Sequence, residues 1–304
     1  MLMLGYSIMK QPETIQNMRL PEWIRTKNSR GLHDTKRVLR KHGIMSVCEE
    51  AKCPNIGECF QKPTAAFMIM GSACSRNCGF CSVASSKPQR LSDDEPERVG
   101  IAAREMGLRY VVITSVTRDD LADGGAGHFA ATVDAVRSHM PEAKVEVLTP
   151  DFKGIAGSVN AVLRSMPDVF NHNIETVPRL YPVARPMADY RRSLSLLAYI
   201  KKNAPGITTK SGLMLGLGEL TTEVVDVLKE LRDTGCDIIT IGQYLRPSRA
   251  NLPVVEYFRP EVFENLRHTA LSMGFQHVFS APLARSSMNA EEIYNGQIAH
   301  RSLI

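Results

Sequence analysis

The stretch Cys74-Ser75-Arg76-Asn77-Cys78-Gly79-Phe80-Cys81 places three cysteines at the spacing C-x3-C-x2-C within one short loop. Thiolate sulfur is a soft ligand that suits iron–sulfur clusters or zinc. Three thiols leave one iron of a four-iron cluster without a protein ligand, and an open metal position is typical of a chemically active site. The preceding residues Ala66-Phe67-Met68-Ile69-Met70 predict a short buried strand that delivers this loop to the edge of a sheet. The alternatives for the loop are a zinc site and a redox dithiol.

A second group of cysteines precedes the first, in the stretch Cys48-Glu49-Glu50-Ala51-Lys52-Cys53-Pro54-Asn55-Ile56-Gly57-Glu58-Cys59. Its spacing, C-x4-C-x5-C, matches neither paired zinc-finger ligands nor the plant-type ferredoxin run. The two triads could ligate one metal assembly or two. Two clusters with three protein ligands each is the more economical interpretation, and structural zinc in the second triad is the alternative.

The composition of the 304 residues is that of an ordinary globular enzyme with a formal charge of +5. No run of eighteen apolar residues predicts a membrane span, and the first residues carry neither a secretory signal nor a transit peptide. Seven cysteines, clustered and odd in number, favour a reducing, cytoplasmic location over a disulfide framework. Basic pairs such as Arg191-Arg192 and Lys201-Lys202 are compatible with an acidic partner, although solvated helix faces are the simpler explanation of each pair.

Beyond residue 92, helical and strand patterns alternate along the chain. The strands expected after 66–70 are 110–114, 144–148, 169–174, 208–215 and 237–241. The helices expected between and after them are 96–106, 127–139, 155–164, 191–203, 222–233 and 261–273. This order predicts an α/β fold with parallel strands joined by right-handed crossovers. Six such units are too few for a closed eight-fold barrel, so we expect an open, partial barrel.

Polar residues follow several of these strands. In such sheets the functional groups lie in loops after the carboxyl ends of the strands. Ser115 and the segment Asn173-Ile174-Glu175 are therefore expected to meet the cysteine loop at one mouth, with ordinary turn roles as the alternative. Lys210, within a strand, faces either the barrel interior or the outside. Cys236 and the histidines, including His172, are expected to be structural.

Two resemblances to known families follow from these motifs. The octet 74–81, with an aromatic residue before its last cysteine, resembles the signature of the radical S-adenosylmethionine (SAM) superfamily. The pairing of C-x4-C-x5-C with C-x3-C-x2-C resembles the lipoyl synthase family. The segments 113–121, 123–126, 171–176 and 210–219 fit this family, and Arg285-Ser286-Ser287 is similar to its Arg-Ser-Ser-Tyr motif, with Met288 in the place of tyrosine.

The resemblance implies a set of site residues. It assigns a four-iron, four-sulfur cluster that cleaves SAM to Cys74, Cys78 and Cys81, and an auxiliary cluster that donates sulfur to Cys48, Cys53 and Cys59. Ser287 is the implied fourth ligand of the auxiliary cluster, with Ser286 as the alternative. The implied SAM contacts are Ser115 to the methionyl group, Asn173 and Glu175 to the ribose, and Lys210.

The function implied by the resemblance is sulfur insertion at C6 and C8 of an octanoyl group on a lysine of a lipoyl carrier domain. Such carriers are 2-oxoacid dehydrogenase E2 subunits and the glycine cleavage H protein. Reduced flavodoxin or ferredoxin is the implied electron donor, and iron–sulfur carrier proteins are further partners, whereas no nucleic acid or membrane is expected. The alternatives are a radical SAM methylthiotransferase and a non-enzymatic two-cluster electron carrier.

The expected organisation has three parts: an N-terminal extension at 1–62 with the auxiliary cysteines, the partial barrel at 63–280, and a C-terminal extension at 281–304 with the Arg-Ser-Ser motif.

Overall fold

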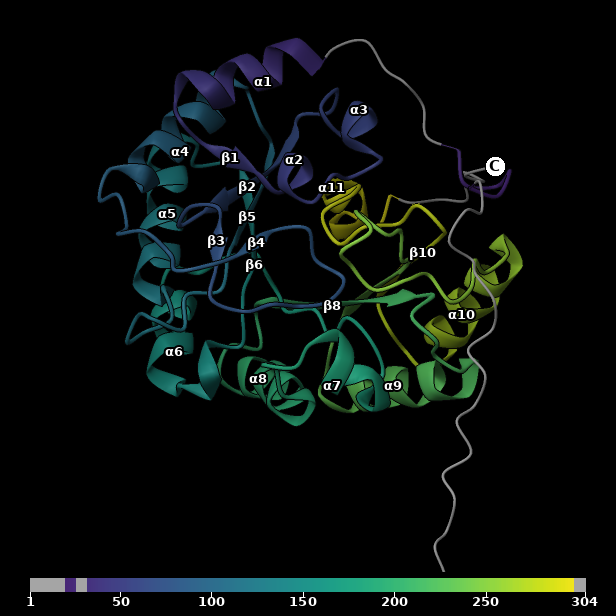
Figure 1. The fold of residues 1–304 in the computed structure, drawn as a ribbon. Helices are drawn as coiled ribbons and strands as arrows, with labels where there is room; N and C mark the ends of the chain where they lie inside the picture. Colours follow the sequence, from purple (N-terminus) through teal and green to yellow (C-terminus); the bar gives the residue numbers. More distant parts are fainter. Residues whose placement is uncertain (1–19, 26–31, 298–304) are drawn as a thin grey trace, which may run out of the picture.

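A computed structural model describes residues 20–25 and 32–297 of the chain. Its centre is an eight-stranded sheet in the order β1-β2-β5-β6-β7-β8-β9-β10 (Figure 1). β1 pairs antiparallel with β2, and every other neighbouring pair is parallel. The strands are β1 Met45–Ser46, β2 Thr64–Ile69, β5 Tyr110–Ser115, β6 Lys144–Leu148, β7 Val169–Asn171, β8 Thr208–Leu215, β9 Ile238–Gln243 and β10 His277–Ser280.

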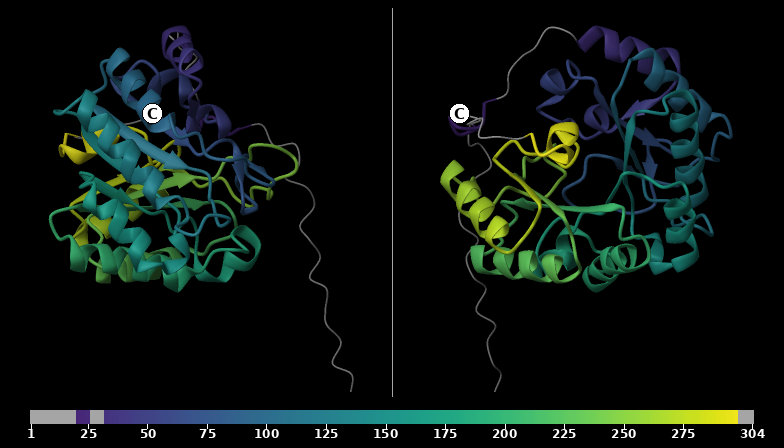
Figure 2. Two further views of the ribbon diagram at one scale, coloured as in Figure 1. Left: turned by 90° about the vertical axis from the view of Figure 1, so that its left-hand side faces the viewer. Right: turned by 180° about the vertical axis from the view of Figure 1, so that it is seen from behind.

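Helices alternate with the strands and form an outer layer around the curved sheet, as Figures 1 and 2 show. The helices of this layer are α4 Glu95–Glu105, α5 Ala126–His139, α6 Ala156–Arg164, α8 Tyr190–Asn203, α9 Thr221–Asp233 and α10 Pro260–Ser272. Shorter elements complete the described chain: α1 Leu32–Lys41, α2 Val47–Glu50, α3 Ile56–Cys59, β3 Ala73–Cys74, β4 Ala84–Ser85, α7 Tyr181–Ala184 and α11 Ala290–Tyr294, with 3-10 turns at Phe152–Gly154 and Pro178–Leu180.

The predicted open barrel is confirmed, and so are its six parallel strands and six helices to within a few residues. The strand expected at 169–174 is shorter, because β7 ends at Asn171 and the chain rejoins β8 only through an isolated bridge between Glu175 and Leu213. Sequence analysis did not predict the two edge strands. β1 has only two residues, and β10 has four, so neither is long enough to show a periodic pattern.

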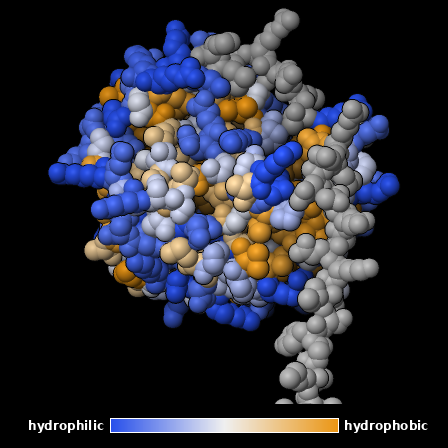
Figure 3. Space-filling view, viewed as in Figure 1, coloured by the Kyte–Doolittle hydropathy of each residue, from blue (hydrophilic) through white to orange (hydrophobic). Residues whose placement is uncertain are grey.

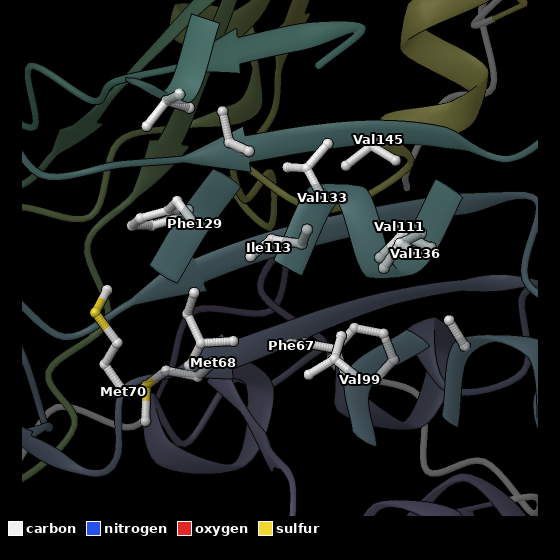
Figure 4. Close-up of a cluster of buried hydrophobic side chains, with 14 of the residues drawn as sticks. Phe67, Met68, Met70, Val99, Val111, Ile113, Phe129, Val133, Val136 and Val145 are labelled. Atoms are coloured by element: carbon white, nitrogen blue, oxygen red, sulfur yellow. The ribbon is translucent and has the colours of Figure 1, made fainter. Parts of the chain in front are cut away.

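The main core lies between the sheet and the outer helices. Phe67 of β2 and Ile113 of β5 are fully buried and lie in one apolar cluster with Val99 of α4 and Val133 of α5 (Figure 4). Burying one such side chain contributes about 1.5–3 kcal/mol relative to leaving it exposed. This layer holds the strands in place, so that the loops after their carboxyl ends form one mouth.

The inner face of the sheet carries charge. Because Val111 and Ile113 pack towards the helices, their neighbour Tyr110 faces the barrel interior. There its hydroxyl donates to Glu146 at 2.8 Å, and the Lys210 ammonium lies 3.0 Å from both Glu146 carboxylate oxygens. Lys210 is 1% exposed, so the interior orientation is the correct one of its two predicted orientations.

The N-terminal segment is anchored on the far end of the chain. The Trp23 indole donates to the Phe258 carbonyl at 3.1 Å, and the Arg259 guanidinium lies over its ring. Residues 1–19 and 26–31 of the N-terminal extension predicted at 1–62 lie outside the described residues. Across 20–25 and 32–297, no helix has the length and apolarity needed to cross a membrane.

Candidate active site

The first cysteine triad sits in the loop after β2. Backbone N–H groups of Arg76 and Thr117 donate to the Cys74 sulfur at 3.4 and 3.3 Å, which ties the loop to the segment after β5. All three thiols are half-buried, and each acts electrostatically on the others. Burial raises the pKa of Cys78, and it raises that of Cys81 to about 11. Without metal Cys78 and Cys81 are protonated, and a bound metal would displace their protons.

Arg76, inside the octet, is buried and paired twice. Its guanidinium donates to Asp119 at 2.7 and 3.0 Å, and to Asp151 at 2.6 Å. Asp119 and Asp151 lie in the loops after β5 and β6, so this side chain fastens the cysteine loop to two neighbouring strands. Sequence analysis missed this role, because the partners are 43 and 75 residues away.

A cover over the triad comes from residues 246–252. Leu252 donates its N–H to the Gly79 carbonyl at 2.9 Å, and the Asn251 amide donates to the Cys81 carbonyl at 2.7 Å. A Cβ at Gly79 would lie 2.9 Å from the Leu252 side chain, so only glycine allows this close approach. The segment after β9 is therefore fastened to the cysteine loop at Gly79 and Cys81.

The polar residues expected at the mouth lie where the strands end. The Ser115 hydroxyl is buried and has no hydrogen-bond partner in the described chain. The Asn173 amide donates to Glu175 at 3.1 Å, and Glu175 has a left-handed backbone with φ of 69°. Burial raises the pKa of Glu175, with Arg185 acting in the opposite direction. The orphaned hydroxyl and the strained carboxylate residue fit a mouth built for a polar ligand.

Arg185 is a site residue that sequence analysis did not identify. It follows α7 and donates to the Asn173 and Ile174 carbonyls at 3.0 and 3.2 Å. Burial by itself lowers its pKa, but Tyr181, Glu175 and Cys78 outweigh burial and raise it. Its Nε atom is buried without a hydrogen-bond partner in the described chain. The arginine is thus a half-buried cation beside the first triad, and its buried Nε is a free donor.

The second triad lies on α2 and α3, on the N-terminal side of the barrel. Cys48 is the second residue of α2, whose cap residue Ser46 accepts the Cys48 N–H with its hydroxyl, and Cys59 ends α3. Burial raises the pKa of Cys48, with Cys53 and Cys59 adding to the increase. It also raises that of Cys59 to about 12, again with a contribution from Cys53. The three thiols therefore lie near one another, as the ligands of one centre must.

The C-terminal motif lies against this second triad. The Asn55 amide, between Cys53 and Cys59, donates to the Leu283 carbonyl at 2.6 Å and to the Met288 sulfur at 3.1 Å. Burial lowers the pKa of Arg285, and Cys53 beside it acts in the opposite direction. Figure 1 shows α11 next to α2 and α3, consistent with these contacts. Segments about 230 residues apart thus meet at one centre.

The two triads are neighbours but separate groups. The Ser82 hydroxyl, just after Cys81, donates to the Glu50 carbonyl and joins their loops. Within each triad the thiols act on one another: Cys53 and Cys59 act on Cys48, and Cys74 and Cys78 act on Cys81. In that same part of the chain, no three His, Cys, Asp or Glu side chains are close enough to hold a single metal ion. Three soft donors on each side fit the wider spacing of a cluster.

Comparison with known proteins matches this arrangement. Residues 68–231 match the Radical SAM superfamily. A lipoyl synthase of Rubrobacter xylanophilus is 52% identical over 274 residues, which cover 90% of this chain and 85% of that protein. A lipoyl synthase of Alkaliphilus metalliredigens is 53% identical over 276 residues, which cover 90% and 95%.

The chain belongs to the lipoyl synthase family. It is a radical SAM enzyme whose cofactors are four-iron, four-sulfur clusters and SAM. This assignment replaces the two alternatives, a methylthiotransferase and an electron carrier.

Solved structures support the fold of this lipoyl synthase family member. The crystal structure of methylornithine synthase (PylB) has a TM-score of 0.55 at 14% identity, and covers 71% of this chain and 63% of that chain. The crystal structure of HydG, a maturase of the [FeFe]-hydrogenase, has a TM-score of 0.57 at 16% identity, and covers 71% and 51%. At this identity the likeness establishes the radical SAM partial barrel and nothing finer.

Among the residues predicted for a lipoyl synthase, the structure brings Ser115, Asn173 and Glu175 to the side of the first triad. Lys210 lies deeper in the barrel, where its ammonium is already paired with Glu146. Cys236 is fully buried, as expected for a small apolar residue.

Proposed function

We propose that this chain inserts sulfur at C6 and C8 of an octanoyl group held on a lysine of a lipoyl carrier domain. The observation that carries the proposal is the pair of separate thiol triads, one at the barrel mouth and one facing the C-terminal motif. When bound, the two clusters and SAM supply the carbon radical and the sulfur that this chemistry needs, because no acid or base removes such a hydrogen.

At the barrel mouth, Cys74, Cys78 and Cys81 would hold the cluster that opens to SAM. Ser115, Asn173 and Glu175 are proposed to bind SAM, and we add Arg185, whose unpartnered Nε lies beside this triad. A half-buried cation with a free donor is suited to a carboxylate, and an orphaned hydroxyl to a polar ligand atom. Lys210 keeps its pairing with Glu146, so a role for it in binding SAM has the weakest support of the predicted contacts.

On the other side, Cys48, Cys53 and Cys59 would hold the cluster that donates sulfur, with Ser287 as its fourth ligand. The Ser286 hydroxyl is already engaged, because it accepts from Asn171 and donates to Asn173. The half-buried Ser287 hydroxyl has no hydrogen-bond partner in the described chain, which favours it over Ser286. An oxygen ligand is poorly matched to iron–sulfur chemistry and would leave readily when the cluster is dismantled.

The proposed protein substrates are 2-oxoacid dehydrogenase E2 subunits and the glycine cleavage H protein. Reduced flavodoxin or ferredoxin is the proposed electron donor, and iron–sulfur carrier proteins are proposed to rebuild the spent cluster. We further propose a cytoplasmic location and the three-part organisation at 1–62, 63–280 and 281–304. The C-terminal motif and the N-terminal cysteines then act together although they lie in different parts.

Iron analysis tests the two-centre assignment. The anaerobic triple variant Cys48→Ala, Cys53→Ala, Cys59→Ala is expected to lose about four irons relative to the wild type. It should still form 5′-deoxyadenosine from SAM and dithionite, but an octanoylated carrier domain should show no gain of sulfur mass. Loss of all the iron, or of none, would contradict two independent centres.

The serine assignment has its own test. Ser287→Ala should abolish sulfur insertion while SAM cleavage continues. Sulfur insertion at the wild-type rate in this variant would remove Ser287 from the proposal.

A further inference from the structure

The segment 282–288 lies between the two centres and touches both. We propose that Ser286 is a positioning residue that orients Asn173 in the SAM site, and that it thereby links SAM affinity to the segment that carries Ser287. This inference rests on the proposed function, because it takes Asn173 as a SAM contact. It assigns the two adjacent serines to opposite centres: Ser287 faces the sulfur donor, and Ser286 faces the barrel.

A directed chain of hydrogen bonds carries the argument. Asn171 donates both amide hydrogens, one to Glu146 at 2.7 Å and one to the Ser286 hydroxyl at 3.0 Å. Since the Ser286 oxygen accepts from Asn171, its own hydrogen points onward to the Asn173 Oδ1, 2.9 Å away. The Asn173 amide nitrogen is thereby turned to Glu175, to which it donates at 3.1 Å. Each donor in this chain meets an acceptor, so the amide of Asn173 has one satisfied orientation.

The end of this series of hydrogen bonds at Glu146 is buried and held by several partners. Glu146 is fully buried and also accepts from Lys210 and Tyr110, so its carboxylate is held from three sides. Asn171 is itself fully buried on β7. The orientation imposed on Ser286 therefore comes from a part of the barrel that does not move with a ligand at the mouth.

Gly212 of β8 leaves the space that the contact needs. A Cβ at this position would lie 2.9 Å from the Asn173 Oδ1 and 3.5 Å from the Ser286 hydroxyl. A side chain here would push the amide oxygen away from the serine. The absence of a side chain at Gly212 is thus a second, independent feature that permits the Ser286–Asn173 contact.

The backbone that precedes Ser286 is held by residues around the second cysteine triad and by β9. The Asn55 amide donates to the Leu283 carbonyl, and Arg285 lies beside Cys53. β9 adds a backbone bond from the Gln243 N–H to the Pro282 carbonyl at 3.0 Å. A shift of this segment would break the Ser286–Asn173 hydrogen bond. We therefore expect weaker SAM binding whenever the segment loses its attachment at the second centre.

Equilibrium SAM binding to anaerobically reconstituted protein tests the proposal. Ser286→Ala should raise the Kd and the KM for SAM about fivefold, the effect of one lost hydrogen bond, while kcat for 5′-deoxyadenosine formation changes less than twofold. Iron content should stay at the wild-type value. In an Asn173→Ala background, the same substitution should change the Kd less than twofold, because Ser286 acts through Asn173. Ser138→Ala, on the surface of α5, is the control and should bind SAM like the wild type.

Gly212→Ala is the second variant and leaves Ser286 intact. Pushing Asn173 from the β8 side should also raise the Kd for SAM severalfold with full iron content, so the proposal is testable even if Ser286→Ala does not fold.

Two results would overturn the inference. One is a wild-type Kd in both Ser286→Ala and Gly212→Ala at full iron content. The other is a loss of about half of the iron in Ser286→Ala with unchanged SAM binding, which would make Ser286 the cluster ligand. Failure of the proposed function is seen separately, as the absence of any gain of sulfur mass on an octanoylated carrier domain treated with the wild-type protein.

Discussion

The buried guanidinium of Arg76 offers a quantitative test of how the cysteine loop is held. Arg76→Met removes the charge and the hydrogen bonds to Asp119 and Asp151 but keeps most of the side-chain volume. Burial by itself lowers the pKa of Arg76, yet the two aspartates outweigh it and raise the pKa above its ordinary value. The variant would leave two carboxylates without their main cation.

The expected cost follows from the exposure of the two partners. Asp151 is 1% exposed and keeps Arg192 at 3.2 Å and the Lys153 N–H at 3.1 Å, whereas Asp119 is 18% exposed and can take up water. Breaking a buried pair from one side costs about 3–5 kcal/mol, and the remaining partners place Arg76→Met near the lower end, at about 3 kcal/mol. We therefore expect the urea midpoint to fall by about 1 M for a chain of this size.

The loss of stability in Arg76→Met should also depend on pH, in a direction set by the pKa of Asp151. Burial by itself would raise the pKa of Asp151, but Arg76 holds it at about 2, below the ordinary 3.8. In the wild type this carboxylate contributes about 2 kcal/mol above pH 3.8, and the contribution is lost as the pH falls through about 2. In Arg76→Met the carboxylate takes up a proton more readily. The difference in stability between the two proteins should therefore shrink as the pH is lowered from 7 towards 4.

The assay is anaerobic urea unfolding of reconstituted protein, followed by far-UV circular dichroism at pH 7 and pH 5, with iron measured on the same samples. Arg179→Met is the matched control, because Arg179 pairs with Glu223 at 52% exposure and such surface pairs contribute about 1 kcal/mol or less. If Arg76→Met unfolds within 0.2 M of this control, which is roughly the error of the measurement, the buried network does not hold the loop.

Three further predictions concern other parts of the barrel. Lys210→Met should cost about 3–5 kcal/mol in urea unfolding, because Glu146 would be left buried without its cation; near-wild-type stability would contradict this. Gly242→Ala should lower the auxiliary iron content and cost about 1–3 kcal/mol, because its Cβ would lie 2.2 Å from the Ala284 carbonyl oxygen; full iron content would show that the segment adapts. Burial lowers the pKa of His172 from 6.5 to about 4. The free energy of unfolding of the wild type should therefore fall by about 3 kcal/mol as the pH is lowered from 6.5 to 4, and this fall should be absent in His172→Gln. An equal pH dependence of urea unfolding in the two proteins would refute this prediction.

Gly157→Ala is the control for Gly242→Ala. A Cβ added to this residue of α6 would meet open space. Alanine there should raise stability by about 0.5–1 kcal/mol, since glycine is unfavourable within a helix.

The rim of the barrel mouth carries exposed apolar side chains. Figure 3 shows apolar surface gathered near the centre and the lower right of the face seen in Figure 1, between charged areas. Three exposed apolar side chains come from α7 and from the loops after β8 and β9, namely Val183, Leu220 and Val255. The barrel thus keeps its polar groups inside and places apolar groups on the segments at its rim.

Much of the site could be predicted from local pattern. The two ligand sets each lie within twelve consecutive residues, so spacing alone identified Cys48, Cys53 and Cys59 as one group. The alternation of apolar runs also predicted six parallel strands, because a buried strand and an amphipathic helix have different periods. Arg185 could not be predicted in the same way, because it lies 107 residues from Cys78 in sequence and no motif marks it.

The amino-acid sequence by itself determined the ligand chemistry, the β–α order and the family, since each of these depends on residues close together along the chain. Only the tertiary structure decided that Ser286 meets Asn173, that Lys210 is paired inside the barrel, and that Arg76 holds two distant aspartates. The physical reason is that such contacts depend on which strands lie side by side and which way each side chain points, and the packing of the whole sheet sets both.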